Sequence, residues 1–495
     1  MRRYNVGKNQ ELKMERWAER GDHAGATALV DRLGTSVSTQ TAPMVPQRRV
    51  RPLYGPLVAA GAAVLTIIVI VSGVLAVRLG PADEVTPADS TPAPTAVVAT
   101  VPAPDAVDVE PTQPTTPVAE PVTPATIDMA TWTEVPLDPE VFGYEPVYDA
   151  EWLDGVLYAV GSSNDEEGEF ASFRGTVWRS PDGVAWERSA TVSDPGSLMY
   201  SIAGSDSLLV AVGEIRLDQT HGAIWTSQDG DTWSRVPHDD DTFGPGFGKI
   251  HEVAAGGPGF VAVGELCEDS ESCFAQPTVW VSENGTSWTR LPFVEGTPGV
   301  INDLTSHNGT LVAVGRTFSE SGDSAAIWIS DDGYTWERIV DDGVFDRAGS
   351  QWISAVTSSE TGIVAVGASM EPGELSNAVV WSSPDGRVWT ISESYTADRP
   401  ASATFEGVTT VGSQYVIVGR QFVYVGPENE DEIRELGLVG EMGMVWTSSN
   451  GSTWTRVNTG KQFFTASLAV VTGNPTGAFT FANMDGLTIW RTPTN

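Results

Sequence analysis

Apolar residues follow two different patterns along the chain. In the first, residues 57–77 (LVAAGAAVLTIIVIVSGVLAV) are almost entirely apolar, and no charged residue lies between Arg51 and Arg78. A helix of this length rises about 30 Å, which matches the hydrocarbon core of a bilayer. Such a helix also satisfies its own backbone hydrogen bonds, which lipid cannot do. The pattern predicts one transmembrane helix within residues 52–79.

The charges on either side of this helix predict its orientation. Arg48, Arg49 and Arg51 precede it, whereas Arg78 alone follows it closely. The positive-inside bias then places residues 1–51 in the cytoplasm and the rest of the chain outside. The apolar run and the basic head are both too long for a cleaved signal peptide, so we predict an uncleaved signal anchor. Residues 9–33 of the head could form a helix that either docks a cytoplasmic partner or lies on the membrane.

The second pattern is a short apolar strand that ends in glycine, as in LYAVG (157–161) and LVAVG (209–213). Six such strands are each followed by the motif W-x-S-x-[DN]-G-x-x-W. The motifs begin at Trp178, Trp225, Trp280, Trp328, Trp381 and Trp446, which lie 47, 55, 48, 53 and 65 residues apart. Each repeat is consistent with four short antiparallel strands. Repeats of this kind and length are typical of a β-propeller.

The tryptophan motif itself predicts a hairpin with a three-residue loop. In Ser180-Pro181-Asp182-Gly183, proline fits the second position of a type I turn, and the glycine then takes a left-handed conformation. Such a loop would place Trp178 opposite Trp186 on one face of the sheet. We interpret the acidic or amide residue of each motif as a turn-stabilising residue: Asp182, Asp229, Asn284, Asp332, Asp385 and Asn450.

The two ends of the repeat region predict how the ring closes. After the sixth motif, the chain has residues for three further strands and then stops. The segment Thr131–Pro136 (TWTEVP) matches the fourth strand of the other repeats. We therefore predict that this segment completes the last blade, because closure removes the exposed strand edges. The predicted fold is an all-β, seven-bladed propeller over residues 127–495.

The motif resembles the Asp-box (BNR) repeat of sialidase-like propellers, in a form one residue shorter than the usual S-x-D-x-G-x-T-W. The resemblance covers the propeller alone. It implies a fold in which these boxes stabilise turns far from any catalytic face. A sialidase-like activity would further require three arginines, a Tyr–Glu pair and an acidic Asp. No spacing in the sequence singles out such a set, so no catalytic residue is assigned.

Composition separates the chain into a basic head and an acidic body. The formal net charge is −37; residues 1–79 carry +6 and residues 80–495 carry −43. An acidic body argues against nucleic-acid binding. Residues 80–126 contain 11 prolines and no Lys or Arg, which predicts an extended extracellular linker. Cys267 and Cys273 lie close together in one loop, and outside the cell we predict a disulfide between them.

Candidate binding residues come from aligning the first strand of each blade, with one inserted residue allowed in blades 5 and 6. One column then contains Asp149, Ser201, Glu252, Asp303, Ser354, Glu406 and Ala466. These side chains would ring the mouth of the central channel, where their oxygens suit sugar hydroxyls or Ca²⁺, or simply water. Arg316 and Arg420 follow their strand-2 glycines and are further candidates for ligand binding. No other cofactor is expected.

These observations favour a single-pass protein of a prokaryotic cell membrane, with a propeller displayed outside on a Pro/Thr stalk. The leading hypothesis is a non-catalytic module that binds a ligand, a glycan, cell-wall material or a surface protein. The alternative is a sialidase-like, exo-acting glycoside hydrolase. A third hypothesis, a transmembrane sensor, rests on the possible helix in the cytoplasmic head.

Overall fold

The computed structural model describes residues 128–493, apart from short gaps at 143–145, 165–171, 206, 268–273, 293–296, 342, 398–400, 424–440, 460–461, 464–465 and 484–486. The described residues do not include the predicted head (1–51), membrane helix (52–79) and linker (80–126). The predicted orientation in the membrane therefore stays a prediction. Within the described part of the chain, no helix has the length and apolar character needed to cross a bilayer.

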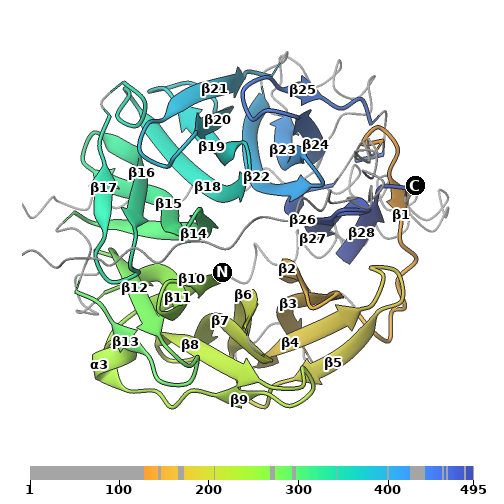
Figure 1. The fold of residues 1–495 in the computed structure, drawn as a ribbon, viewed down its shortest axis with the longest axis vertical. Helices are drawn as coiled ribbons and strands as arrows, with labels where there is room; N and C mark the ends of the chain where they lie inside the picture. The colour runs from red at the N-terminus through yellow and green to blue at the C-terminus, as the bar shows by residue number, and fades with distance from the viewer. Residues whose placement is uncertain are drawn as a thin grey trace, which may run out of the picture. The chain divides into compact units, whose positions relative to one another are not determined.

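Seven four-stranded antiparallel sheets form a ring around a central axis (Figure 1). This arrangement confirms the predicted all-β, seven-bladed propeller. Blades 1 to 3 contain β2 (Val147–Leu153), β3 (Val156–Asn164), β4 (Phe173–Ser180), β5 (Glu187–Thr191); β6 (Ser197–Ser205), β7 (Leu208–Arg216), β8 (Thr220–Ser227), β9 (Ser234–Arg235); and β10 (Gly248–Gly256), β11 (Gly259–Leu266), β12 (Gln276–Ser282), β13 (Thr289–Arg290). A short helix, α3 (Asp240–Phe243), joins β9 to β10.

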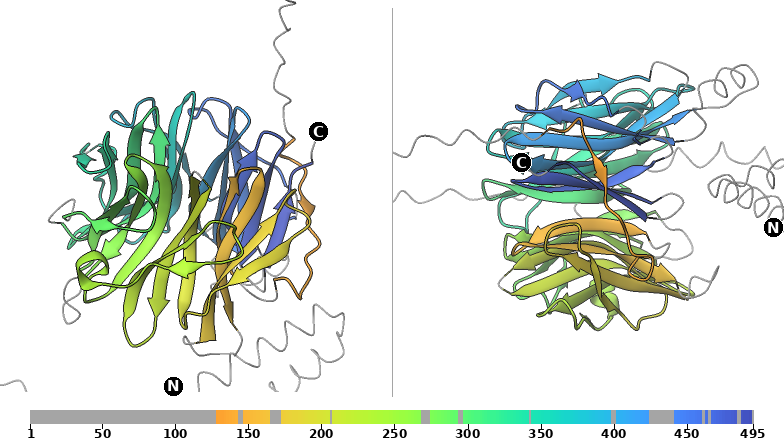
Figure 2. Two further views of the ribbon diagram at one scale, coloured as in Figure 1. Left: turned by 60° about the horizontal axis from the view of Figure 1, so that its bottom comes forward. Right: turned by 90° about the vertical axis from the view of Figure 1, so that its right-hand side faces the viewer.

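The remaining blades follow the same order, with the first strand of each blade innermost, and Figure 2 shows the ring from two other sides. Blades 4 to 6 contain β14 (Gly299–His307), β15 (Thr310–Ser319), β16 (Gly322–Ser330), β17 (Glu337–Ile339); β18 (Ser350–Ser359), β19 (Gly362–Met370), β20 (Asn377–Ser383), β21 (Thr390–Tyr395); and β22 (Ala401–Val411), β23 (Gln414–Val423), β24 (Glu441–Ser448), β25 (Thr455–Arg456). Blade 7 contains β26 (Leu468–Asn474), β27 (Gly477–Asn483), β28 (Leu487–Arg491) and β1 (Thr133–Glu134).

Blade 7 closes the ring by joining the two ends of the propeller, as the sequence predicts. Strand β1 pairs antiparallel with β28, so that Thr133 lies opposite Arg491 and Glu134 opposite Trp490. Figure 1 shows this pair at the edge of the blade. The backbone N–H of Val135 extends the pairing by donating to the carbonyl of Ile489 (2.8 Å). The fourth strand of the last blade is thus supplied by the first strand of the propeller.

The turns of the tryptophan motifs differ from the predicted three-residue loop. Gly183 has the predicted left-handed conformation (φ 71°), but Trp178 lies opposite Arg188 rather than opposite Trp186. The Asp182 carboxylate accepts the backbone N–H groups of Val184 (2.9 Å) and Ala185 (2.8 Å). These bonds hold the chain in a wider loop, and the Trp186 indole folds back to donate to the Gly183 carbonyl (3.0 Å). The turn-stabilising interpretation of the Asp-box residues agrees with these bonds.

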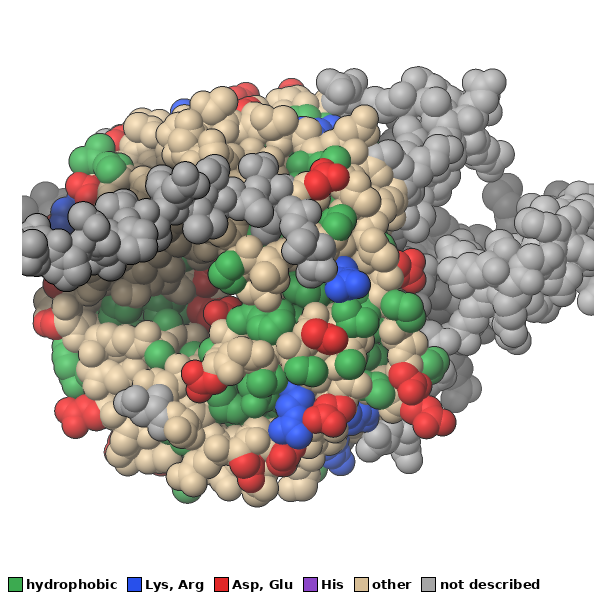
Figure 3. Space-filling view, turned by 45° about the vertical axis from the view of Figure 1, so that its right-hand side comes forward, with side chains coloured by type: hydrophobic (Ala, Val, Ile, Leu, Met, Phe, Trp, Pro, Cys, Tyr) green, Lys and Arg blue, Asp and Glu red, His purple; other side chains and the backbone are tan. Residues whose placement is uncertain are grey.

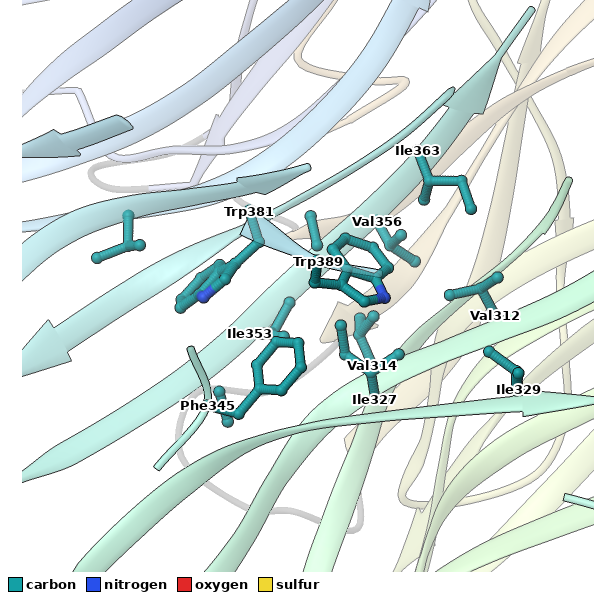
Figure 4. Close-up of a cluster of buried hydrophobic side chains, with 13 residues drawn as sticks. Val312, Val314, Ile327, Ile329, Phe345, Ile353, Val356, Ile363, Trp381 and Trp389 are labelled. Carbon is teal, nitrogen blue, oxygen red and sulfur yellow. The ribbon is translucent and has the colours of Figure 1, made fainter. Parts of the chain in front are cut away.

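The hydrophobic core lies between neighbouring blades rather than at the centre of the ring. Between blades 4 and 5, Trp381 of β20 packs among aliphatic side chains from both sheets (Figure 4). The cluster includes Val312, Val314, Ile327, Ile329, Ile353, Val356 and Ile363. Burying each large apolar side chain contributes about 1.5–3 kcal/mol. Because every blade is packed in this way, the ring holds its innermost strands in fixed positions.

Candidate functional site

Each innermost strand carries a β-bulge at the same place. In blade 1, Val147 pairs with Gly161 and Asp149 with Val160, which leaves Tyr148 as the extra residue. A Cβ added to Gly161 would lie 2.0 Å from the carbonyl oxygen of Pro146. Glycine is therefore favoured where the bulge brings two backbones together, and six of the seven blades have it there. The extra residues of the seven bulges are Tyr148, Tyr200, His251, Asn302, Ser354, Glu406 and Ala469.

The bulges match the predicted alignment of the first strands in four blades and contradict it in three. The positions directly after the bulges are Asp149, Ser201, Glu252, Asp303, Ala355, Gly407 and Val470. Ser354 and Glu406 are bulge residues one position earlier, because blades 5 and 6 contain no inserted residue. Ala466 precedes β26 altogether. The positions directly after the bulges therefore hold carboxylates only in blades 1, 3 and 4, instead of around the whole ring.

The innermost strands enclose a cavity of about 850 Å³ along the axis. Five carboxylates contribute to its wall: Asp149, Glu151, Glu252, Asp303 and Glu406. No Lys or Arg is present among the described residues that line it. Glu151 was missed by the sequence analysis, although it lies two residues after Asp149 and strand alternation places the two on the same face. Figure 3 shows that acidic side chains are also more widespread than basic ones on the visible surface.

Several of the cavity's polar side chains link neighbouring blades. Asp149 accepts the backbone N–H of Ile202 in blade 2 (3.0 Å). Asp303 of blade 4 makes the equivalent bond to Val356 in blade 5 (2.7 Å). Ser201 accepts the N–H of Val253 (3.3 Å) and donates to the Glu252 carboxylate (2.6 Å), which joins blades 2 and 3. These side chains therefore have a structural role in addition to any role in binding.

Burial raises the pKa values of the cavity carboxyl groups, and neighbouring carboxylate charges add to this effect for Glu151, Glu252 and Asp303. Burial raises the pKa of Asp149 to about 6 and that of Asp303 to about 7, against the lowering effect of their backbone hydrogen bonds. Burial, with the charges of these two residues, also raises the pKa of Glu252. The Glu151 side chain is exposed to the cavity, but protein surrounds that cavity. Removal from bulk water and the charges of Asp149 and Asp303 raise the pKa of Glu151 as well.

An aromatic ladder lies on the bulges of blades 1 to 3 and was also missed from sequence. It consists of Tyr148, Tyr200 and His251, all of which line the cavity. The rings of Tyr148 and Tyr200 meet edge to face, with centroids 5.2 Å apart. The Tyr200 ring stacks on the His251 ring, with centroids 6.1 Å apart and planes 12° from parallel. Only the bulge register, which sequence does not reveal, brings these three rings together.

A buried charge cluster supports the middle of the ladder. Glu214 of β7 is 0% exposed and forms an ion pair with Arg216. The Tyr200 hydroxyl forms hydrogen bonds with Glu214 and with Arg216. Glu214 Oε2 has no hydrogen-bond partner among the described residues, and the Lys249 ammonium lies 3.9 Å away. Burial and the Glu214 charge raise the pKa of Tyr200, so its phenol stays protonated.

The two arginines predicted as ligand-binding residues lie in ion pairs of their own blades. Arg316 pairs with Asp323 of β16 at 3.1 Å. Arg420 pairs with Glu406 at 2.9 Å and with Glu441 at 3.2 Å. The structure thus brings Glu406 and Arg420 together, but neither arginine lines the cavity.

The predicted calcium site and disulfide remain untested. Within the described ranges, no group of three or more His, Cys, Asp or Glu side chains is placed to hold a metal ion. Cys267 is buried at the end of its strand, but Cys273 lies outside the described residues. Both therefore stay predictions.

Comparisons with known proteins give similarity of fold at low identity. No family model matches the chain, and no curated protein matches it. One similar crystal structure is of a protein assigned as a glycoside hydrolase from Parabacteroides distasonis, at 11% identity and a TM-score of 0.34, covering 76% of this chain and 95% of that one. Another is a mutant of the Trypanosoma rangeli sialidase that displays trans-sialidase activity, at 14% identity and a TM-score of 0.35.

The second match covers 71% of this chain and 54% of the sialidase chain, so this chain spans about half of that protein's length. The Asp-box resemblance rests on the repeated motif.

Proposed function

We propose that the propeller is a non-catalytic binding module, displayed on the cell surface by the N-terminal anchor, that holds its ligand in the central cavity. A glycan, cell-wall material or an extended segment of a surface protein would suit the site. The observation that carries the proposal is the cavity itself, whose described lining contains aromatic rings and five carboxylates but no Lys or Arg. Rings that pack against a ligand and a few polar groups that orient it are typical of binding sites.

A sialidase-like, exo-acting hydrolase is the second candidate, and one observation favours it. Tyr200, Glu214 and Arg216 lie together beside the cavity, which supplies a Tyr–Glu pair and one arginine. Two features weigh against catalysis. The raised pKa of Tyr200 opposes its activation as a nucleophile. The described cavity lining also contains no arginine that could bind a substrate carboxylate.

Blocking the cavity tests this proposal. Ala469 is an exposed bulge residue that lines the cavity, so Ala469→Trp would fill the mouth without disturbing the core. We expect the full chain in detergent to bind one or more members of a panel of glycans and cell-wall fragments. The Ala469→Trp variant should bind the same ligands at least tenfold more weakly. Ala130→Trp, at an exposed position outside the cavity, is the matched control.

If the Ala469→Trp variant binds the ligand as tightly as the parent does, the ligand binds elsewhere and the proposal is refuted. Turnover of a fluorogenic sialoside or glycoside by the full chain, abolished by Tyr200→Phe, would establish the hydrolase instead.

A further inference from the structure

The aromatic ladder presents a preorganised platform inside the cavity. Three rings from three successive blades are held edge to face and face to face by their bulges. Tyr200 is also fixed from behind by the fully buried Glu214 and its partner Arg216. Rings that are fixed before binding lose little conformational freedom when a ligand stacks on them. The apolar face of a sugar ring matches such a platform.

The charges around the platform restrict the class of ligand. Glu151 lies on the same strand as Tyr148, two residues beyond Asp149, or about 7 Å deeper along β2. No hydrogen bond or ion pair engages its carboxylate among the described residues, and none of those that line the cavity is a Lys or Arg. An anionic ligand would add charge of the same sign to a cavity that already disfavours ionisation of its carboxyl groups, whereas an ammonium would supply the missing counter-charge.

We propose that the cavity binds an amino sugar oligomer, whose rings stack on Tyr148 and Tyr200 and whose ammonium groups face Glu151 and its neighbouring carboxylates. This inference rests on the proposed binding function and adds the charge class of the ligand. Because an ammonium favours the ionised form of nearby carboxyl groups, binding releases protons from the cavity.

Three oligosaccharides of matched length test the charge class by titration calorimetry on the full chain in detergent at pH 6.5. The probes are β-1,4-linked tetramers of glucosamine and of N-acetylglucosamine, and a tetramer of galacturonic acid. We expect the glucosamine tetramer to bind at least tenfold more tightly than the acetylated one, and the acidic one not to bind. Titrations in two buffers of different ionisation enthalpy should show proton release with the glucosamine tetramer.

Two pairs of variants place the ligand on the named residues. Glu151→Gln keeps the side-chain shape and should weaken glucosamine tetramer binding about tenfold, whereas Glu360→Gln, in an exposed turn, should not. Tyr200→Ala should also weaken binding about tenfold, and Tyr200→Phe should preserve it because the ring remains.

Equal affinity for the acetylated tetramer, or full affinity in Glu151→Gln, would overturn the charge inference. If the acetylated or acidic tetramer binds and Ala469→Trp abolishes that binding, the inference fails while the binding function stands. If none of the three probes binds, the inference fails, and the wider panel of glycans and cell-wall fragments decides the function.

Discussion

Replacing Trp132 with alanine should lower the free energy of unfolding by about 3–5 kcal/mol, the range for removing a fully buried tryptophan. Trp132 follows the predicted linker, yet it is 2% exposed and packs against Phe463 and Trp490 of the last blade's core cluster. Its indole N–H donates to the Met129 carbonyl (2.8 Å). The side chain therefore joins the first strand of the propeller to the last blade.

Chemical denaturation followed by tryptophan fluorescence measures this loss. The matched control is Trp233→Ala, because Trp233 stands at the equivalent place in blade 2 but is only partly buried. Trp233→Ala should lower the free energy of unfolding clearly less than Trp132→Ala does. A Trp132→Ala variant within about 1 kcal/mol of the parent would show that the N-terminal strand does not hold the ring closed.

The propeller should be more stable near pH 5.5 than near pH 8. The folded pKa values of Asp149 and Asp303 (about 6 and about 7) lie above the ordinary value of 3.8, so the folded state holds protons that the unfolded chain has already lost. The resulting stabilisation is complete below about pH 4 and is lost as the pH rises through 6 and 7. Because the cavity, at about 850 Å³, is large enough to admit water, we expect each carboxyl group to contribute about 1–2 kcal/mol, which corresponds to a fall of a few degrees in Tm at the higher pH.

Glu252→Gln tests the source of this pH dependence. Glutamine retains an oxygen that accepts the Ser201 hydroxyl, but it removes one charge from the cluster. The variant should match the parent in Tm at pH 5.5 and exceed it at pH 8, whereas Glu360→Gln should follow the parent throughout. A parent Tm that rises between pH 5.5 and pH 8, or a Glu252→Gln curve parallel to that of the parent, would rule out the carboxylate cluster as the cause.

The fold could be predicted because its determinants repeat along the chain. Six tryptophan motifs mark the blades, and the segment Thr131–Pro136 repeats the fourth strand, so closure followed from matching the chain ends. The hairpin register could not be predicted in the same way. It depends on hydrogen bonds that the Asp182 carboxylate accepts and the Trp186 indole donates, and these widen the loop without changing the turn residues.

The site was predicted only in part because its geometry depends on the bulges. Asp149, Glu252 and Asp303 were found from their distance to a repeated glycine, but nothing in the sequence shows that one residue in each strand is extra. Tyr148 and Tyr200 are such extra residues, so they were overlooked although they lie next to the predicted column. In blade 7, Ala482 stands in place of the repeated glycine. The alignment of the first strands was counted from that glycine, so it failed in this blade.

A single cross-link tests the closure of the ring most directly. Thr133 and Arg491 lie opposite each other in the β1–β28 pair, so the double variant Thr133→Cys/Arg491→Cys should form a disulfide within one chain, detected by mass spectrometry of the digested, unreduced protein. The pair Thr133→Cys/Arg456→Cys, which uses the fourth strand of blade 6, should not. Our account predicts a cross-link in the first variant and none in the second; the absence of the first, or the presence of the second, would contradict it.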